Sequence, residues 1–139
     1  MVKDMELLKA TLNDTEELAR LNLELMIAED YDQKLPLEKL IPRMSTFLKT
    51  GYDAFFIDFK GKKAGYILIK TSSTPLYIRQ FYILPEFQRR GLGQMTIKAI
   101  QKYYKTRTFD VEVMAWNEAG YNFWKKAGFE KRCYSMRLK

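Results

Sequence analysis

The sequence contains no histidine, and this absence narrows the possible chemistry more than any other feature of its composition. Histidine is the side chain that most often serves as a base, a proton shuttle or a metal ligand near neutral pH. Mechanisms that pair serine or cysteine with histidine are therefore excluded, and so are histidine metal sites. We expect no metal.

Cysteine and long apolar runs are also scarce. The single cysteine, Cys133, rules out an intrachain disulfide, and its place in an alternating C-terminal segment favours a buried or half-buried structural residue over a reactive thiol. No stretch approaches the roughly 20 consecutive apolar residues of a membrane span, and no basic segment precedes an apolar one at the N-terminus. These absences predict a soluble, cytoplasmic protein with no membrane partner.

What the chain does contain is enough apolar material for one domain and an excess of positive charge. Its 139 residues are 47% hydrophobic and 14% aromatic, which predicts a single domain over residues 1–139. The 24 lysines and arginines against 17 acidic residues give a net charge of +7 and favour an anionic partner. The lysines are scattered along the chain, which argues against a nucleic-acid interface.

Periodicity predicts the elements of the first half of the chain. Asn13 and Glu16 resemble a capping box before a helix with apolar residues at helical spacing, and Pro36 and Gly51 bound a second helix. Lys60-Gly61-Lys62 connects two β-rich runs as a hairpin. The predicted elements are strand 5–12, helix 14–29, helix 36–51, strand 53–59 and strand 63–71.

The second half continues with strand 76–84, closed by Pro85, and with a helix over residues 91–105. A strand over 109–116, a last helix that Asn117 can cap and Gly128 ends, and a final strand over 129–138 complete the prediction. The order is β-α-α-β-β-β-α-β-α-β. It predicts an α+β fold with a mixed, mostly antiparallel twisted sheet and helices on both faces.

Between strand 76–84 and the helix that follows lies a glycine-containing loop, Gln88-Arg89-Arg90-Gly91-Leu92-Gly93. The first N–H groups of a helix have no internal partner, and the helix dipole adds partial positive charge there. Glycines allow the backbone to approach a pyrophosphate closely, and the two arginines add cationic charge. The loop is typical of a pyrophosphate site, although a Gly-x-Gly pair also occurs in plain tight turns.

Spacing excludes two common nucleotide loops. A dinucleotide fingerprint requires a third glycine where this chain has Thr96, and no strand ending in an acidic residue follows at the proper distance. A nucleoside triphosphate loop requires Gly-Lys-Ser/Thr after the helix-opening glycine, and that sequence is missing. A Gln-x-x-Gly-x-Gly loop remains.

This loop resembles that of the GNAT superfamily of acyl-CoA-dependent N-acyltransferases, where an Arg/Gln-x-x-Gly-x-Gly/Ala loop after the fourth strand binds the CoA pyrophosphate. A second segment, from Asn117 to Phe129, is similar to the family's Asn-x-x-Ala-x-x-x-Tyr-x-x-x-Gly-Phe pattern. The element order agrees over nearly the whole chain. The resemblance implies that acetyl-CoA is the cofactor and that the fourth and fifth strands splay apart to receive its pantetheine arm. The cofactor-binding residues it implies are Ile83, Leu84, Gln88, Arg89, Arg90, Gly91, Leu92, Gly93, Gln94, Asn117 and Trp124.

The sequence departs from the family at the position of its usual proton donor, a tyrosine on the last helix. Trp124 stands there, and its indole N–H donates a hydrogen bond but cannot supply a proton. Tyr121 is the catalytic alternative on the same helix, and Tyr82 and Tyr134 are further ones, although aromatic residues at such spacings mostly fill cores.

No carboxylate occupies the middle of the fourth strand, where some family members carry an acidic pair and this chain has Arg79 and Gln80. The candidate bases are elsewhere, and each is also compatible with a plain solvated carboxylate. Arg79 is suited to hold a carboxylate or phosphate of the acceptor, whereas Asp30 and Asp32 hint at a cationic amine. The candidate bases are Glu24, Glu29, Asp30, Glu86 and Glu112, and the predicted substrate-binding residues are Glu29, Asp30 and Arg79.

The sequence therefore predicts an N-acetyltransferase that transfers acetyl from acetyl-CoA to a primary amine of a small molecule, peptide or protein. A CoA-binding regulatory module without catalysis is the alternative, because Trp124 and Arg79 replace expected groups. The identity of the acceptor and a homodimeric state both stay open at this point.

Overall fold

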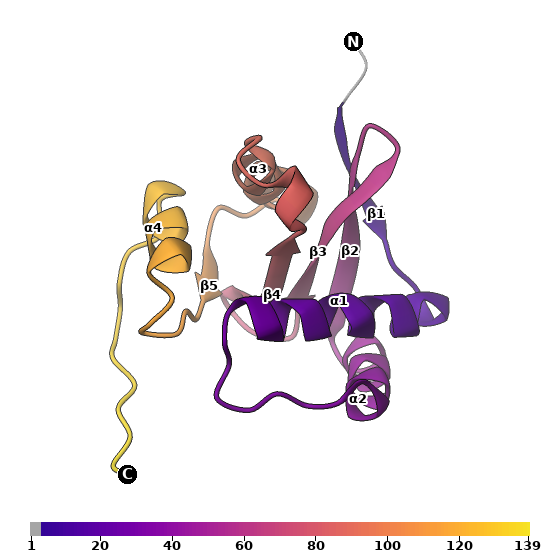
Figure 1. Cartoon of the computed structure of the whole chain (residues 1–139). Helices are drawn as coiled ribbons and strands as arrows, with labels where there is room; N and C mark the ends of the chain where they lie inside the picture. Colours follow the sequence, from indigo (N-terminus) through magenta and orange to yellow (C-terminus); the bar gives the residue numbers. More distant parts are fainter. Residues whose placement is uncertain (1–3) are drawn as a thin grey trace.

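The computed structural model describes residues 4–139, and its centre is a five-stranded sheet in the order β1-β2-β3-β4-β5 (Figure 1). The first four strands are antiparallel neighbours, and β5 pairs with β4 in parallel. The mixed, mostly antiparallel sheet predicted from the sequence is confirmed. The strands are β1 (Met5–Lys9), β2 (Tyr52–Phe59), β3 (Lys62–Lys70), β4 (Leu76–Ile83) and β5 (Phe109–Val111).

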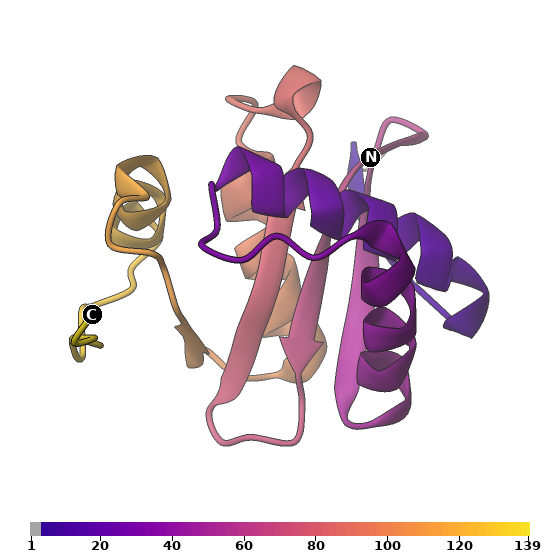
Figure 2. The same ribbon diagram turned by 60° about the horizontal axis from the view of Figure 1, so that its bottom comes forward.

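Helices cover both faces of this sheet, as predicted. The helices α1 (Thr15–Ala28) and α2 (Leu37–Lys49) pack on one face, and α3 (Leu92–Tyr104) packs on the other (Figure 2). The short helix α4 (Glu118–Lys126) lies beside the β5 edge (Figure 1).

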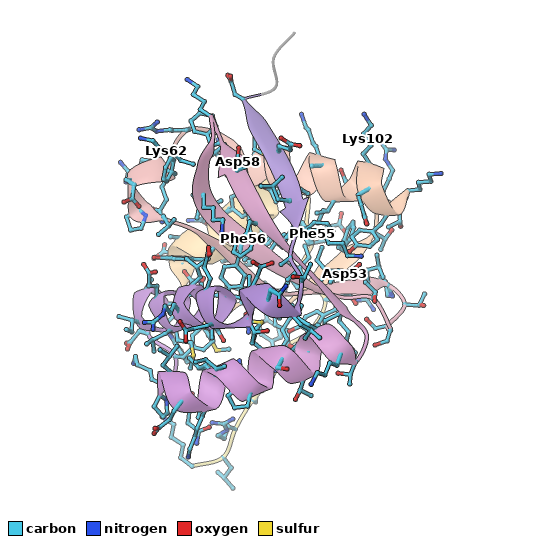
Figure 3. The ribbon with its side chains drawn as sticks, turned by 90° about the vertical axis from the view of Figure 1, so that its right-hand side faces the viewer. Asp53, Phe55, Phe56, Asp58, Lys62 and Lys102 are labelled. Carbon is cyan, nitrogen blue, oxygen red and sulfur yellow. The ribbon has the colours of Figure 1, made fainter. Side chains whose placement is uncertain are left out.

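The alternation of side chains along β2 explains these two layers. Successive residues of a strand point to opposite faces. Phe56 therefore joins the cluster beneath α1 and α2, while Phe55 joins the cluster beneath α3 (Figure 3). Both phenyl rings are almost completely buried, and each such side chain contributes about 1.5–3 kcal/mol to folding. The sheet is thus held from both sides.

The chain leaves the sheet earlier at its N-terminal end than we predicted. β1 stops at Lys9, and Leu12–Asp14 form a 3₁₀ helix before α1. The capping box is formed by Thr11 and Asp14, because the Thr11 N–H donates to Asp14 Oδ2 at 2.8 Å and the Asn13 N–H donates to Thr11 Oγ1 at 3.2 Å. The prediction of an Asn13 and Glu16 box was therefore displaced by two residues.

The C-terminal end differs more. β5 contains only Phe109–Val111, and the structure has no strand over the predicted range 129–138. Residues 130–139 are exposed, Cys133 included, so its expected burial was wrong. A strand needs a ladder partner, and this segment runs away from the sheet (Figure 1). The segment alternates as a strand does, but the fold places no strand beside it to form a ladder.

β4 carries the irregularity that matters most for the site. Its register with β3 shifts between the pairs Leu68–Gln80 and Ile69–Ile78, which leaves Arg79 as the extra residue of a β-bulge. Its pairing with β5 ends at Ile78 and Val111. Beyond that point the two chains separate, as the resemblance implied, and the rest of β4 forms an open edge.

Candidate functional site

The open edge of β4 presents backbone groups of Phe81 and Ile83. The Leu84 N–H donates to the Ala64 carbonyl at 2.8 Å, so Leu84 and, by alternation, Tyr82 face β3. Phe81 and Ile83 consequently point their N–H and C=O groups toward the gap that β5 leaves. Ile83 thus faces the gap as the prediction required. The Leu84 N–H is committed to β3, and the assignment of Leu84 to the cofactor stays a prediction.

Gln88 holds the end of this edge. Its side-chain Nε2 donates to the Ile83 carbonyl at 2.8 Å, and its own N–H donates to the Pro85 carbonyl at 3.2 Å. The side chain therefore ties the loop to β4, and the assignment of Gln88 to the cofactor stays a prediction.

The loop leads into α3 through a left-handed residue at its start. Gly91 is the N-cap with φ of 78°, a conformation that costs a residue with a Cβ atom free energy, and Arg89 has φ of 63°. Within residues 4–139, the N–H groups of Leu92, Gly93 and Gln94 have no backbone acceptor, and Met95 is the first to bond back, to Gly91 at 3.1 Å. Free N–H groups at a helix N-terminus form a ready anion site.

The two arginines of the loop are exposed to a ligand, whereas the side chain of Leu92 is not. Arg89 and Arg90 are exposed, and the Arg90 guanidinium lies 5.8 Å from the centre of the Phe87 ring. Leu92 is buried in the core, so its side chain has a structural role and only its N–H can meet a ligand.

Gly93 has a second reason to be glycine that the sequence did not reveal. A Cβ atom at this position would lie 2.5 Å from Phe123 Cε1. The absent side chain is therefore required where α3 meets α4, in addition to any close approach of a phosphate. This contact connects the two segments that carry the family resemblance.

A cleft opens between β4, the chain that follows β5 and the C-terminal end of α1. It brings together residues predicted from the sequence that are far apart in the chain. The sequence-predicted residues that line it are Glu29, Arg79, Glu112, Asn117 and Trp124, with Tyr31, Gln80 and Phe81 as neighbours.

Glu29 is the carboxylate most firmly held in this cleft. Its Oε2 accepts a hydrogen bond from Asn117 Nδ2 at 3.0 Å, and its backbone carbonyl accepts one from Trp116 Nε1 at 3.2 Å. These bonds bring the end of α1 to the start of α4 (Figure 1). Burial raises the pKa of Glu29 above its ordinary value, and the hydrogen-bonding side chains of Tyr31 and Asn117 oppose this rise in pKa.

Of the two roles that the sequence left open for Asn117, a helix cap and a contact with the cofactor arm, the structure shows the cap, and the cofactor contact stays a prediction. Its Oδ1 accepts the Gly120 N–H at 2.9 Å, which caps α4. Its amide nitrogen points into the cleft, where it binds Glu29. The cap is thus confirmed, and the amide donates to a carboxylate of the same chain.

Tyr31 is a site residue that sequence reasoning missed. Burial and the nearby Glu29 raise the pKa of its phenol to about 12, so the hydroxyl stays protonated near neutral pH. A tyrosine in the connection between two helices gives no pattern that would select it. Glu112 is held differently: it accepts the Tyr77 hydroxyl at 2.7 Å, and burial followed by this contact raises the pKa of Tyr77.

Trp124 packs into the wall of the cleft. Its ring centre lies 5.0 Å from that of Phe129 and 5.7 Å from that of Phe81. Within the described part of the chain its indole N–H has no hydrogen-bond acceptor, in contrast to that of Trp116. The N–H is therefore available to a ligand.

The other tyrosines considered do not line the cleft. Tyr82 is buried in the core beneath α1 and α2, and Tyr134 is exposed and accepts from Lys131 Nζ at 3.3 Å. Tyr121 lies 5.4 Å from the same lysine, measured from Nζ to the ring centre. None of these three tyrosines lines the cleft that holds the carboxylates of Glu29 and Glu112.

The remaining acidic candidates lie outside the cleft as well. Asp30 forms an ion pair with Lys34 at 3.0 Å, and Asp32 lies 3.9 Å from Arg137. Glu24 and Glu86 are exposed. Among residues 4–139 no group of three or more acidic or cysteine side chains is placed to hold a metal ion, and none of the described helices is long and apolar enough to cross a membrane.

With this geometry established, comparison with known proteins decides the family. The model of the acetyltransferase (GNAT) family matches residues 15–129 of the chain. The chain belongs to this acetyltransferase family. The resemblance stated from the loop and from the Asn117–Phe129 segment is thereby confirmed, and with it the expectation of an acetyltransferase.

Solved structures with the same fold include several acetyltransferases. One is a possible acetyltransferase from Clostridium difficile 630, at 15% identity and a TM-score of 0.79 over 99% of this chain and 97% of that one. The aminoglycoside N-acetyltransferase AAC(6')-Iy in complex with CoA is 16% identical, with a TM-score of 0.77 over 100% and 96%.

A third is an acetyltransferase from Thermus thermophilus, which is 20% identical with a TM-score of 0.75 over 93% of this chain and 88% of that chain. At these identities the structures establish the fold of this family member and no more. No curated protein sequence matches the chain.

Proposed function

We propose that the protein is an N-acetyltransferase that transfers acetyl from acetyl-CoA to a primary amine by direct attack on the thioester. The observation that carries this proposal is the open edge of β4, which lies between the free N–H groups at the start of α3 and the cleft around Glu29. A cofactor with an anionic end and an extended arm fits this sequence of sites.

The cofactor's pyrophosphate would meet the N–H groups of Leu92, Gly93 and Gln94, with Arg89 and Arg90 beside it. Its pantetheine arm would run along β4 and bond to the Ile83 N–H and to backbone groups of Phe81, as an added strand does, while the Ile83 carbonyl keeps its bond from Gln88. The Phe81 N–H is then placed to donate to the thioester carbonyl oxygen as negative charge develops on it.

In the reaction, the neutral amine attacks the carbonyl carbon, the C–S bond breaks and CoA leaves as a thiolate. Glu29 receives the proton that the amine nitrogen loses. Its raised pKa makes it a stronger base than an exposed glutamate. The free indole N–H of Trp124 stabilises the thiolate by hydrogen bonding, and a thiol of pKa near 8.5 leaves without prior protonation.

Thiol release tests this proposal. Acetyl-CoA mixed with a panel of polyamines, aminoglycosides, amino acids and lysine peptides should release CoA thiol with at least one acceptor. Glu29→Gln should abolish most of this release while calorimetry shows unchanged CoA binding, and the exposed Glu6→Gln is the matched control with full activity. Failure of acetyl-CoA and CoA to bind at millimolar concentration would contradict the proposal.

A CoA-binding module without catalysis is the second candidate, and Trp124 at the position of the family's tyrosine is the observation that favours it. This candidate predicts tight CoA binding with no thiol release for any acceptor in the panel.

The acceptor, the oligomeric state and the cellular location belong to the proposal as well. The solved relatives include aminoglycoside acetyltransferases, one of them in complex with sisomicin, which makes an amine-bearing small molecule a reasonable first choice. A single domain over residues 1–139, a homodimer and a cytoplasmic location stay predictions.

A further inference from the structure

Two arginines from different elements lie against one aromatic ring beside the cleft. The Arg43 guanidinium carbon lies 5.3 Å from the centre of the Phe47 ring, and that of Arg79 lies 4.8 Å from it. Arg43 and Phe47 are one turn apart on α2, whereas Arg79 is the bulge residue of β4. The bulge re-aims Arg79 toward α2.

Neither charge is neutralised by the protein. Within residues 4–139, no salt bridge involves Arg43 or Arg79. Arg79 has one weak contact, from Nη1 to the Tyr52 hydroxyl at 3.5 Å, and the buried Nε of Arg43 has no hydrogen-bond partner in that part of the chain. Burial and then the proximity of Arg79 lower the pKa of Arg43.

Arg79 is exposed to water and Arg43 is half-buried, so the cost of this arrangement falls mainly on Arg43. Like charges close together repel, and a buried guanidinium N–H without an acceptor loses the hydrogen bond it had in water. The Phe47 ring offsets part of this cost through its face. An anion between the two guanidinium groups would offset their mutual repulsion, because each can bind carboxylate or phosphate oxygens through its terminal N–H groups.

The position of the pair relates it to the reaction. Arg79 lines the same cleft as Glu29, Tyr31 and Trp124. Tyr31 is close enough to both arginines for each of them to lower its pKa, and close enough to Glu29 for that carboxylate to raise it. A molecule that presents an amine to Glu29 therefore has the two arginines within reach of its other end.

We propose that the acceptor amine carries an anionic group, a carboxylate or a phosphate, that Arg43 and Arg79 bind together. This inference rests on the proposed acetyl transfer and specifies its substrate class. The acceptor would be an amino acid, a peptide with a nearby carboxylate, or an amine phosphate. A polycationic aminoglycoside would meet two positive charges at this place and is disfavoured.

Acceptors matched in everything but charge test the proposal. Thiol release is measured with amino acids against their amides, and with 2-aminoethyl phosphate against ethanolamine, so that the two arms separate carboxylate from phosphate. We expect the better anionic acceptor to exceed its neutral partner at least tenfold in kcat/KM. Equal rates for the charged and neutral partners, or an aminoglycoside as the best acceptor, would overturn it.

Variants then assign the preference to the arginines. Arg43→Gln and Arg79→Gln should each raise KM for the anionic acceptor about tenfold or more with little change in kcat, and leave KM for its neutral partner unchanged. Arg79→Glu should reverse the preference. The exposed Arg20→Gln is the matched control and should change nothing. An unaltered preference in Arg43→Gln and Arg79→Gln would contradict the assignment.

Direct binding separates this inference from the acetyl transfer itself. Calorimetry with inorganic phosphate in the presence of saturating CoA, which occupies the loop, should show binding to the wild type that Arg79→Gln and Arg43→Gln lose. Phosphate binding without thiol release would support the anion site and contradict the transferase. Thiol release with unaltered phosphate binding in both variants would support the transferase and contradict the anion site.

Discussion

Glu29 shows how a single carboxylate obtains a role from its surroundings. Its hydrogen bond to Asn117 and its burial act on its pKa in opposite directions, and burial is the larger effect. A raised pKa means that ionised Glu29 costs the fold stability. That cost is absent below the ordinary value of 4.5 and complete above the pKa in the folded protein.

The first prediction concerns Glu29→Gln. If Glu29 is the base, kcat/KM of the wild type falls as the pH drops below its raised pKa, and the variant loses about 100-fold or more of kcat/KM together with this acid limb. A pH–rate profile measures both. Because the variant removes a carboxylate whose ionisation is unfavourable, its stability relative to the wild type should be greater at pH 7 than at pH 4. An acid limb that survives in Glu29→Gln would show that another group titrates.

The second prediction uses Asn117→Asp. Aspartate caps a helix as well as asparagine does, so the bond to the Gly120 N–H is kept. The donor to Glu29 is lost, however, and a negative charge takes its place. The pKa of Glu29 should rise further, which moves the acid limb of the pH–rate profile upward.

Asn117→Ala is the matched comparison, because it removes the cap and the donor without adding charge. It should lower the free energy of unfolding by about 1 kcal/mol and move the acid limb upward by less than Asn117→Asp. If both variants keep the wild-type profile, the contact with Glu29 does not tune the base.

At the scale of elements, α3 and α4 meet at a point where there is no room for a methyl group. The ring of Phe123 occupies the space that a side chain at residue 93 would need. The Gly-x-Gly loop and the Asn117–Phe129 segment therefore pack directly against each other, and we expect a substitution in one to shift the other.

The third prediction follows from this contact. Gly93→Ala forces the Phe123 ring aside and should lower the free energy of unfolding by about 1–3 kcal/mol, as overpacking does. Chemical denaturation measures the loss. In the background of Phe123→Ala the same substitution should cost less, so that the two changes are not additive. Additive effects would mean that the ring does not limit residue 93.

Most elements could be predicted from the sequence to within one or two residues, because their patterns are local. The apolar stripes of α1, α2 and α3 and the apolar and aromatic runs of β2 to β4 are read from neighbouring residues. β5 and the segment 129–138 were overestimated for the opposite reason. Whether an alternating run becomes a strand depends on a partner, and Val111 is the last residue of β5 that has one.

At the scale of the whole molecule, the C-terminal segment is the part that the chain leaves uncovered. Tyr134, Met136 and Leu138 recur at every second residue, and their side chains are 78%, 90% and 99% exposed. One face of an extended segment would therefore be apolar, and an exposed face of this kind marks an interaction surface.

The fourth prediction is that a second copy of the chain covers this surface. Light scattering should find a dimer of the full chain and a monomer of a chain truncated after Phe129. Tyr134→Ser, Met136→Ser and Leu138→Ser together form the control that keeps the length, and they should also give a monomer. A full-length monomer at the concentrations used for assays would contradict the prediction.

Local features of the sequence were enough to exclude whole classes of chemistry and to identify the family. The absence of histidine, the Gln88–Gly93 loop and the segment that begins at Asn117 can all be recognised without knowledge of the fold. Which side chains act together was decided by tertiary packing. Glu29 meets Asn117 across 88 positions of the chain, and Arg79 meets Phe47 because a bulge turns it toward α2. Such contacts depend on the packing of whole elements, which no spacing in the sequence encodes.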